Sequence, residues 1–356
     1  MLPSVASGGA FTAFRAIVLG LRGRGLRAEA VILGSRPDRG PDRDRGEELA
    51  ARYLGVSGGW ADVFRRTPAA RAVRAALEEL RPGVVHSHLW PAAFACGRPP
   101  AGVRHVLHVQ DTRPWVRGRK LPDRARRAAA RRAARGRAAL CVSAAVAEYH
   151  APLLEAGRVL IAPNAVDRDR FAVSDPPAGP LRLVVLARFS PEKGHRELLL
   201  SLADLRAAGV PFRAVFAGSG SLRAELESLA AELSVADAVE FPGEVADVRP
   251  LLAAAHLHVL PTLGCEGLPL CIREAAACGR PTFASAVPGV PEAVRDGVDG
   301  RLLPPGDRAA WSSALREAAG DAAGLAGMGR RARAAVPGWG ETIDRVVGVY
   351  TGASGR

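Results

Sequence analysis

Short apolar runs alternate with segments of helical periodicity along most of the chain. Glycine, proline and polar clusters separate them, and the alternation is clearest after residue 180. Strands that alternate with helices indicate a parallel sheet covered by helices. The strands expected there are 182–187, 212–217, 239–242, 256–260 and 281–284, and the helices are 198–207, 222–233, 248–254, 270–277 and 341–350.

The first half of the chain carries the same alternation in a weaker form. The segment 35–45, rich in Pro, Arg, Asp and Gly, is predicted to be a loop, and the proline-rich segment 174–180 is predicted to be a linker. We therefore expect an α/β protein with domains at 1–173 and 174–337. The strands expected in the first are 28–33, 84–88, 106–109, 139–143 and 159–163, and the helices follow Gly9 and cover 69–80 and 117–137.

Composition fits a protein of this kind. The 356 residues are enough for two domains, and the 48% apolar and 24% charged content is typical of globular proteins. There is no apolar run of about 18 residues to span a membrane. Arg15 interrupts the first apolar segment, which also lacks a basic leader, so we expect a cytoplasmic protein.

The five cysteines stand at positions 96, 141, 265, 271 and 278 and form no C-x-x-C pair. This scatter predicts free thiols, mostly buried, and gives no indication of a zinc site. Cys265 and Cys271 are expected to be packing residues.

The formal net charge of +13 is carried almost wholly by arginine. Of the 49 basic residues, only Lys120 and Lys193 are lysines, which resembles the coding bias of a GC-rich genome. Against that bias, Lys193 either survives by chance or marks a place that needs a compact charge, as phosphate binding does. The basic segment 117–137 could face an anionic membrane or a nucleic acid. It lacks interleaved aromatic residues, which favours a solvated helix face and no nucleic-acid partner.

Two segments carry candidate chemistry. Residues 262–281 predict a loop that follows a strand and opens a helix, with Glu266 in the loop and Glu274 in the helix. Amides at such a helix start suit an anion such as a diphosphate, and the two carboxylates could accept from sugar and ribose hydroxyls. Acidic residues near a helix start also have a plainer explanation in the helix dipole. The required cations are expected from Arg188 and Lys193, which lie in the segment 187–195.

Together these segments resemble the retaining, nucleotide-sugar-dependent glycosyltransferases of the GT-B fold, glycosyltransferase family four. The motifs 163–167, 218–220 and 297–303 support the resemblance, which is weaker in the first half. It implies two Rossmann-like doubly wound parallel-sheet domains that face each other across a cleft. The first would bind the acceptor and the second the donor. The last helix would cross back, so that 338–356 completes the first domain.

The resemblance also implies roles for individual residues. Arg188 and Lys193 would neutralise the leaving diphosphate while Glu266 orients the sugar, with no metal ion and no cofactor beyond the nucleotide diphosphate sugar. A departure from the family lies at Gln110, where many relatives have a histidine, because glutamine cannot carry a proton. The donor-binding residues would be Gly8, Gly9, Gly218, Val245, Gly267, Leu268, Pro269, Leu270 and Glu274.

Acceptor-binding candidates follow two strands of the first domain. His86 and His88 end one strand, and His108 and Asp111 lie at the end of the next. The plainer interpretation, which the sequence favours, is that His86 and His88 cap the strand and pack.

We therefore expect a retaining transferase that moves a sugar from a UDP- or GDP-linked donor to the hydroxyl of a small molecule, a glycan or a lipid-linked acceptor. A lipid-linked acceptor would bring 117–137 to the inner face of the membrane. The alternatives are an epimerase or phosphorylase of the same fold, or a basic protein that binds membranes or nucleic acids.

Overall fold

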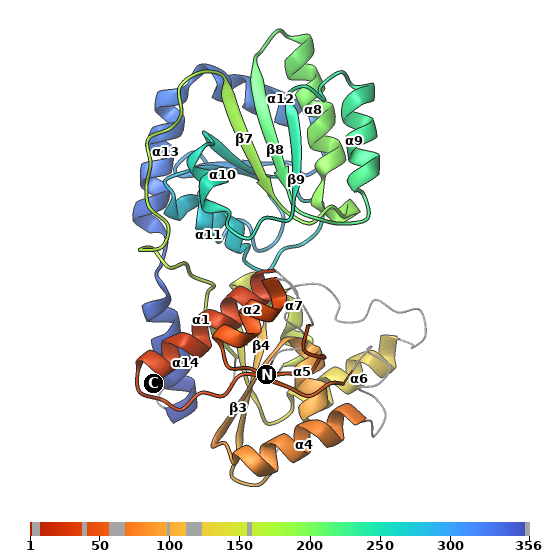
Figure 1. Ribbon diagram of the computed structural model, residues 1–356, viewed down its shortest axis with the longest axis vertical. Helices are drawn as coiled ribbons and strands as arrows, with labels where there is room; N and C mark the ends of the chain where they lie inside the picture. Colours follow the sequence, from red (N-terminus) through yellow and green to blue (C-terminus); the bar gives the residue numbers. More distant parts are fainter. Residues whose placement is uncertain are drawn as a thin grey trace. The chain divides into compact units, whose positions relative to one another are not determined.

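The computed structural model describes residues 1, 8–37, 41–56, 68–97, 100–111, 123–154 and 159–352 (Figure 1). Its contacts divide the chain into two compact units. Met1–Asn164 and Trp339–Arg356 form the first, and Ala165–Gly338 forms the second. By this division the segment 174–180, expected to be a linker, lies within the second unit.

The second unit is built on a parallel sheet of six strands in the order β12-β11-β10-β7-β8-β9. The five strands expected from the apolar runs are confirmed, and β12 adds an edge strand that the periodicity did not predict. Their bounds are β7 Leu181–Leu186, β8 Phe212–Ala217, β9 Val239–Gly243, β10 Leu257–Leu260, β11 Thr282–Ser285 and β12 Gly300–Leu303.

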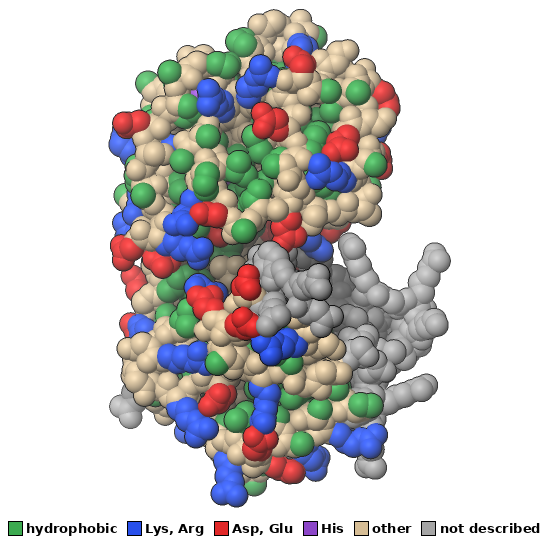
Figure 2. All heavy atoms as spheres, viewed as in Figure 1, with side chains coloured by type: hydrophobic (Ala, Val, Ile, Leu, Met, Phe, Trp, Pro, Cys, Tyr) green, Lys and Arg blue, Asp and Glu red, His purple; other side chains and the backbone are tan. Residues whose placement is uncertain are grey.

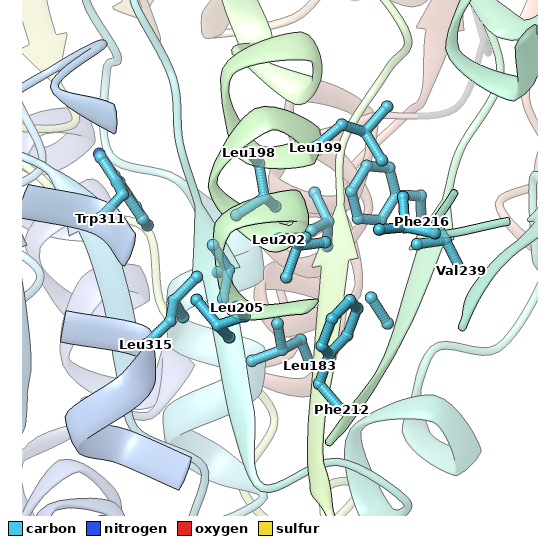
Figure 3. Close-up of a cluster of buried hydrophobic side chains, with 14 of the residues drawn as sticks. Leu183, Leu198, Leu199, Leu202, Leu205, Phe212, Phe216, Val239, Trp311 and Leu315 are labelled. Atoms are coloured by element: carbon cyan, nitrogen blue, oxygen red, sulfur yellow. The ribbon is translucent and has the colours of Figure 1, made fainter. Parts of the chain in front are cut away.

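Helices cover both faces of this sheet, because successive side chains of a buried strand point to opposite sides. Leu183 and Val185 of β7 pack with α8, α9 and α12, as Figure 3 shows for Leu183, whereas Val184 packs with α10, α11 and α13. The unit is therefore doubly wound. The helices are α8 His195–Ala207, α9 Arg223–Glu232, α10 Arg249–Ala253, α11 Leu270–Ala277, α12 Arg308–Gly320 and α13 Ala322–Ala335.

The first unit contains a parallel sheet of four strands, β3-β4-β5-β6, and a two-stranded parallel pair, β1-β2. The expected strand 28–33 is reduced to the two residues of β1. The bounds are β1 Val31–Ile32, β2 Arg52–Tyr53, β3 Val84–His88, β4 Arg104–Val109, β5 Ala138–Cys141 and β6 Val159–Ile161.

Helices also lie on both faces of the four-stranded sheet. Val85 packs with α4 and α5, whereas Val106 and Leu140 pack with α1 and α14. Ser143 begins α7 by accepting a hydrogen bond from the amide of Val146, as an N-cap does. The helices are α1 Gly9–Gly23, α2 Pro41–Glu48, α4 Pro68–Leu80, α5 Leu89–Cys96, α6 Asp123–Ala134, α7 Ala144–His150 and α14 Trp339–Thr351.

The C-terminal helix α14 belongs to the first unit, as expected. A Cβ atom added at Gly20 of α1 would lie 2.0 Å from Cδ1 of Ile343, so the two helices approach closely at this glycine. Thr342 donates a hydrogen bond to the carbonyl of Pro163 at 2.8 Å. The chain thus leaves the first unit and returns to it, which confirms the expected fold of two Rossmann-like parallel-sheet domains.

Two expectations need correction, and two segments relevant to the predictions lie outside the described residues. The loop predicted over 35–45 is helical from Pro41, where α2 begins. Cys265 is exposed and is not a packing residue. Part of the basic segment, 117–122, lies outside the described residues, as do residues 2–7 before the first glycine pair.

On the face shown in Figure 2, the described basic and acidic side chains are interspersed. None of the described helices combines the length and the apolar character that a membrane crossing requires.

Candidate donor site

The loop after β7 carries Arg188 and Lys193 to the end of β10. Its last residue, Gly194, has a φ of 68°, in the left-handed region that glycine adopts at little cost. A Cβ atom at this position would lie 1.9 Å from the carbonyl oxygen of Pro261, which follows β10. Glycine is therefore required for the two loops to meet at the carboxyl ends of neighbouring parallel strands, where ligands bind in α/β sheets.

Lys193 and Glu266 form an ion pair across these loops. Nζ of Lys193 lies 2.5 Å from Oε1 of Glu266, although 73 residues separate the two in the sequence. Their side chains are only 13% and 12% exposed. Charges this sheltered are stable only when paired, so the contact fixes both side chains in one place.

Backbone hydrogen bonds hold the same two loops together. The carbonyl of Glu192 accepts from the amide of Leu263 at 2.8 Å and from the hydroxyl of Thr262 at 2.9 Å. Its carboxylate lies 3.8 Å from the guanidinium of Arg188, whose side chain is 60% exposed. Arg188 is thus a solvent-facing cation, paired with Glu192, in the same loop as the partly buried Lys193–Glu266 ion pair.

A second glycine supports the loop that carries Glu266. Gly289 has a φ of 89°, and a Cβ atom there would lie 2.3 Å from the carbonyl oxygen of Glu266 and 2.4 Å from that of Gly267. The amide of Glu266 donates to the carbonyl of Pro288 at 3.1 Å. The sequence analysis did not predict this support. The available signal was a glycine between Pro288 and Val290.

The helix α11 begins at Leu270, directly after this loop, with Pro269 as its N-cap residue. Its N-terminus lends partial positive charge to the same end of the sheet. Glu274 lies in its second turn, and desolvation raises the pKa of this carboxyl to about 7, against the opposing effect of the Arg170 charge. Near pH 7 the carboxyl of Glu274 is therefore only partly ionised.

The two glycines after β8 pack against the backbone of the Arg188 loop. A Cβ atom at Gly218 would lie 2.0 Å from the carbonyl oxygen of Ala187, and one at Gly220 would lie 2.2 Å from that of Phe189. The amide of Gly218 also bonds to the carbonyl of Gly243, at 2.8 Å. That bond ties the loop to the chain just before Val245, a partly buried residue.

The structure thus brings most of the predicted donor residues into one group of loops in the second unit. Gly8 and Gly9 belong to the first unit, where Gly8 is the N-cap residue of α1. The predicted acceptor residues also lie in the first unit. His88 and His108 are each 1% exposed, and the backbone carbonyl of Asp111 lies 2.9 Å from Nε2 of His150.

Known protein families and solved structures match both units of the chain. A family model described as Glycosyltransferase Family 4 matches residues 7–170, and one described as Glycosyl transferases group 1 matches residues 180–321. Two solved structures share the fold over 99% of this chain. Sucrose-phosphate synthase from Thermosynechococcus elongatus has a TM-score of 0.81 at 20% identity, with 98% of its chain covered. HepE from Anabaena, in complex with UDP and glucose, has a TM-score of 0.82 at 21% identity, also with 98% covered.

Curated relatives are more similar over shorter segments. The D-inositol 3-phosphate glycosyltransferase of Geodermatophilus obscurus is 36% identical over 217 residues, which cover 55% of this chain and 48% of that protein. The protein of the same name from Streptomyces avermitilis is 34% identical over 222 residues, covering 56% and 48%. The chain therefore spans less than half the length of these relatives.

The fold is that of the GT-B class, and both consecutive family matches are to glycosyltransferase families. Within that class, the chain belongs to glycosyltransferase family four. The comparisons favour a transferase over the epimerase, phosphorylase and basic binding-protein alternatives.

Proposed function

We propose that the protein is a retaining glycosyltransferase that moves a sugar from a nucleotide diphosphate sugar, UDP- or GDP-linked, to an acceptor hydroxyl. The observation that carries the proposal is the meeting of Lys193 and Glu266 at 2.5 Å, in the loop that leads into α11. This places a cation, a carboxylate and a helix N-terminus at the carboxyl end of one sheet. HepE of the same fold, solved in complex with UDP and glucose, supports a donor of this class.

The diphosphate is the part of the donor that these groups suit best. As the sugar leaves, negative charge builds on the diphosphate, and the ammonium of Lys193 stabilises it together with the N-terminus of α11. Arg188, anchored by Glu192 and exposed, supplies a second cation from the same loop. Two fixed cations and a helix N-terminus perform the charge neutralisation for which other transferases use a metal ion.

The carboxylates act on the neutral parts of the donor. Glu266 accepts hydrogen bonds from sugar hydroxyls, and its ion pair with Lys193 holds it in the orientation to do so. Glu274, four residues after the start of α11, accepts from the ribose diol in its ionised form. The first unit binds the acceptor. The acceptor hydroxyl attacks from the side of the leaving diphosphate, so that the anomeric configuration is retained.

A ligand panel tests the donor class. Thermal unfolding is measured with UDP, GDP, ADP and TDP and with the matching monophosphates, since a ligand that binds only the folded state raises the midpoint. The proposal expects UDP or GDP to give the largest shift and its monophosphate a clearly smaller one. Equal shifts from monophosphate and diphosphate would contradict a diphosphate site. Proton NMR of the product, which reads the anomeric configuration, then tests retention.

A further inference from the structure

Three histidines of the first unit gather on one face of its sheet. His86 and His88 are two residues apart on β3, so their side chains point to the same side of the strand. The β3–β4 register pairs His88 with His108 on the neighbouring strand. The ring centroids are 4.6 Å apart for His86 and His88, 4.8 Å for His88 and His108, and 5.2 Å for His86 and His108.

The ring nitrogens of this trio are close together and incompletely satisfied. One nitrogen of each ring lies within 4.8 Å of the other two. Both nitrogens of His108 are buried without a hydrogen-bond partner among the described residues, and so is Nε2 of His86. Buried polar atoms usually have a partner, and leaving one without it costs about 1–3 kcal/mol. Two of the three rings therefore carry a buried nitrogen that has no partner among the described residues.

A neighbouring hydroxyl orients one of the rings as metal sites do. The hydroxyl of Tyr350, from α14, lies 2.6 Å from Nδ1 of His86. A tyrosine oxygen that accepts from Nδ1–H fixes the tautomer that leaves Nε2 of His86 free to bind a metal, the role that such partners have in histidine metal sites. The amide nitrogen of Gln110 lies 2.7 Å from Nδ1 of His88 and donates to it, so His88 takes the metal-binding tautomer only when this amide turns to present its oxygen.

The protonation state is also the one that a metal requires. Burial lowers the pKa of His86 and His88 well below the usual value, with the neighbouring histidines adding to the effect, and burial alone lowers that of His108 to about 3. The three rings are therefore neutral near pH 7, and a neutral imidazole is the form that coordinates metal ions.

We propose that His86, His88 and His108 form a binding site for a divalent first-row transition metal ion, with Zn²⁺ as the expected occupant. Three imidazoles without a thiolate suit zinc and its neighbours rather than magnesium or calcium. Zn–N bonds of about 2.0–2.1 Å need the nitrogens to draw together to about 3.4 Å, from their present separations of up to 4.8 Å. The three rings supply three ligands of a tetrahedral zinc ion and leave its fourth position to a small ligand such as water. The site links β3 and β4 to the C-terminal helix through Tyr350.

This assignment is independent of the donor chemistry, because every residue in it belongs to the first unit. It replaces acceptor binding as the role of the three histidines, since His88 and His108 are almost completely buried. The sequence alone gave no reason to expect it, because the cysteine spacing excludes a thiolate site and the histidines come from two strands.

The test uses the full chain without a polyhistidine tag, freed of metal by a chelator. Titration with Zn²⁺ alone, followed by calorimetry, is expected to show one equivalent per chain. Co²⁺ is expected to give the visible absorption of a low-symmetry nitrogen site. His108→Ala is expected to weaken Zn²⁺ binding at least 100-fold. His105→Ala is the matched control, because His105 is also buried on β4 but its Nε2 lies against Ser87 Oγ at 2.6 Å.

Tyr350→Phe keeps the ring and removes only the hydroxyl that orients His86. By the usual effect of such partners, it should weaken zinc binding about 10–100-fold while circular dichroism stays unchanged. Zinc is also expected to raise the unfolding midpoint of the native chain but not that of His108→Ala. Failure of the native chain to bind one equivalent of Zn²⁺, or equal affinity in the native, His108→Ala and Tyr350→Phe chains, would overturn the proposal.

Discussion

The ammonium group of Lys193 and the carboxylate of Glu266 lie 2.5 Å apart, from loops that follow β7 and β10. In a chain with only two lysines, one of them thus closes an ion pair at the ligand-binding end of a parallel sheet. The pair is satisfied before any donor arrives. A diphosphate that binds there must share the ammonium with Glu266, so the two side chains form a pre-organised site rather than one assembled by the ligand.

Replacement of this lysine tests its part in catalysis. In Lys193→Ala, the developing charge on the diphosphate loses its nearest cation, so the barrier should rise by on the order of 2–4 kcal/mol, or about 30- to 1,000-fold in kcat. Steady-state kinetics with the best donor give the value. Arg196→Ala is the matched control, because Arg196 is an exposed cation three residues away that pairs with Glu225 at 3.8 Å. Near-normal turnover in Lys193→Ala would contradict the proposed role.

Because Gly289 packs against the backbone of the Glu266 loop, adding a single methyl group at position 289 should weaken donor binding. In Gly289→Ala the new Cβ would press on the carbonyls of Glu266 and Gly267, so the loop must move and the donor affinity should fall at least tenfold. Gly297→Ala is the control. Gly297 also has a positive φ, 70°, but has no atom within 4 Å of an added Cβ. Both substitutions strain the backbone, and only the first should impair nucleotide binding in calorimetry. Equal losses of nucleotide affinity in the two variants would rule out a specific role for Gly289.

The raised pKa of Glu274 predicts a stability that depends on pH. Its carboxyl ionises at about 7 in the folded chain against a reference value of 4.5, so the folded state holds the proton longer. Stability should therefore fall as pH rises from about 4.5 to about 7 and stay level above that. Glu274→Gln removes this loss of stability. The free energy of unfolding of the variant should exceed that of the native chain by about 1–3 kcal/mol at pH 8, and the difference should vanish below pH 4.5.

The same substitution should weaken the donor site, because glutamine is a poorer acceptor for the ribose diol than a carboxylate. Urea unfolding at pH 4.5 and pH 8, paired with nucleotide titration at pH 8, measures both effects. If Glu274→Gln is less stable than the native chain at pH 8, or binds nucleotide as tightly as the native chain does, Glu274 does not have the proposed role.

Because α14 packs in the core of the first unit, shortening a buried side chain of this helix should lower the stability of the fold. Ile343 is 4% exposed and packs beside Gly20 of α1, so Ile343→Ala leaves a cavity and should cost about 2–4 kcal/mol of unfolding free energy. Val347→Ala, on the same helix but only partly buried, should cost less than half as much. Urea denaturation compares the two. Similar costs would show that α14 does not complete this core.

Much of the fold was predictable because buried parallel strands leave continuous apolar runs. The strands around Leu183, Phe216 and Val259 are of this kind, and each was predicted within two residues. The short edge strand β12 was missed, because its exposed edge relaxes the demand for apolar residues. The helix from Pro41 was predicted to be a loop, because its composition is charged rather than amphipathic.

The candidate donor site was predictable only as a set of separate residues. Spacing and charge singled out Arg188, Lys193, Glu266 and Glu274 as candidates, because each has a residue type that suits a part of a nucleotide diphosphate sugar. Their contacts depend on how two loops pack, and no local pattern contains the fit of Gly194 against Pro261. The histidine cluster was out of reach for the same reason, since the register of β3 and β4 decides which side chains meet.

The most direct test of the central claim is the affinity of the best nucleoside diphosphate for the native chain and for Arg188→Ala/Lys193→Ala, measured by calorimetry beside the nucleoside that lacks phosphate. If these cations hold the diphosphate, the double variant should bind it at least 100-fold more weakly and bind the nucleoside almost unchanged. Undiminished affinity for the diphosphate in the double variant would contradict the account.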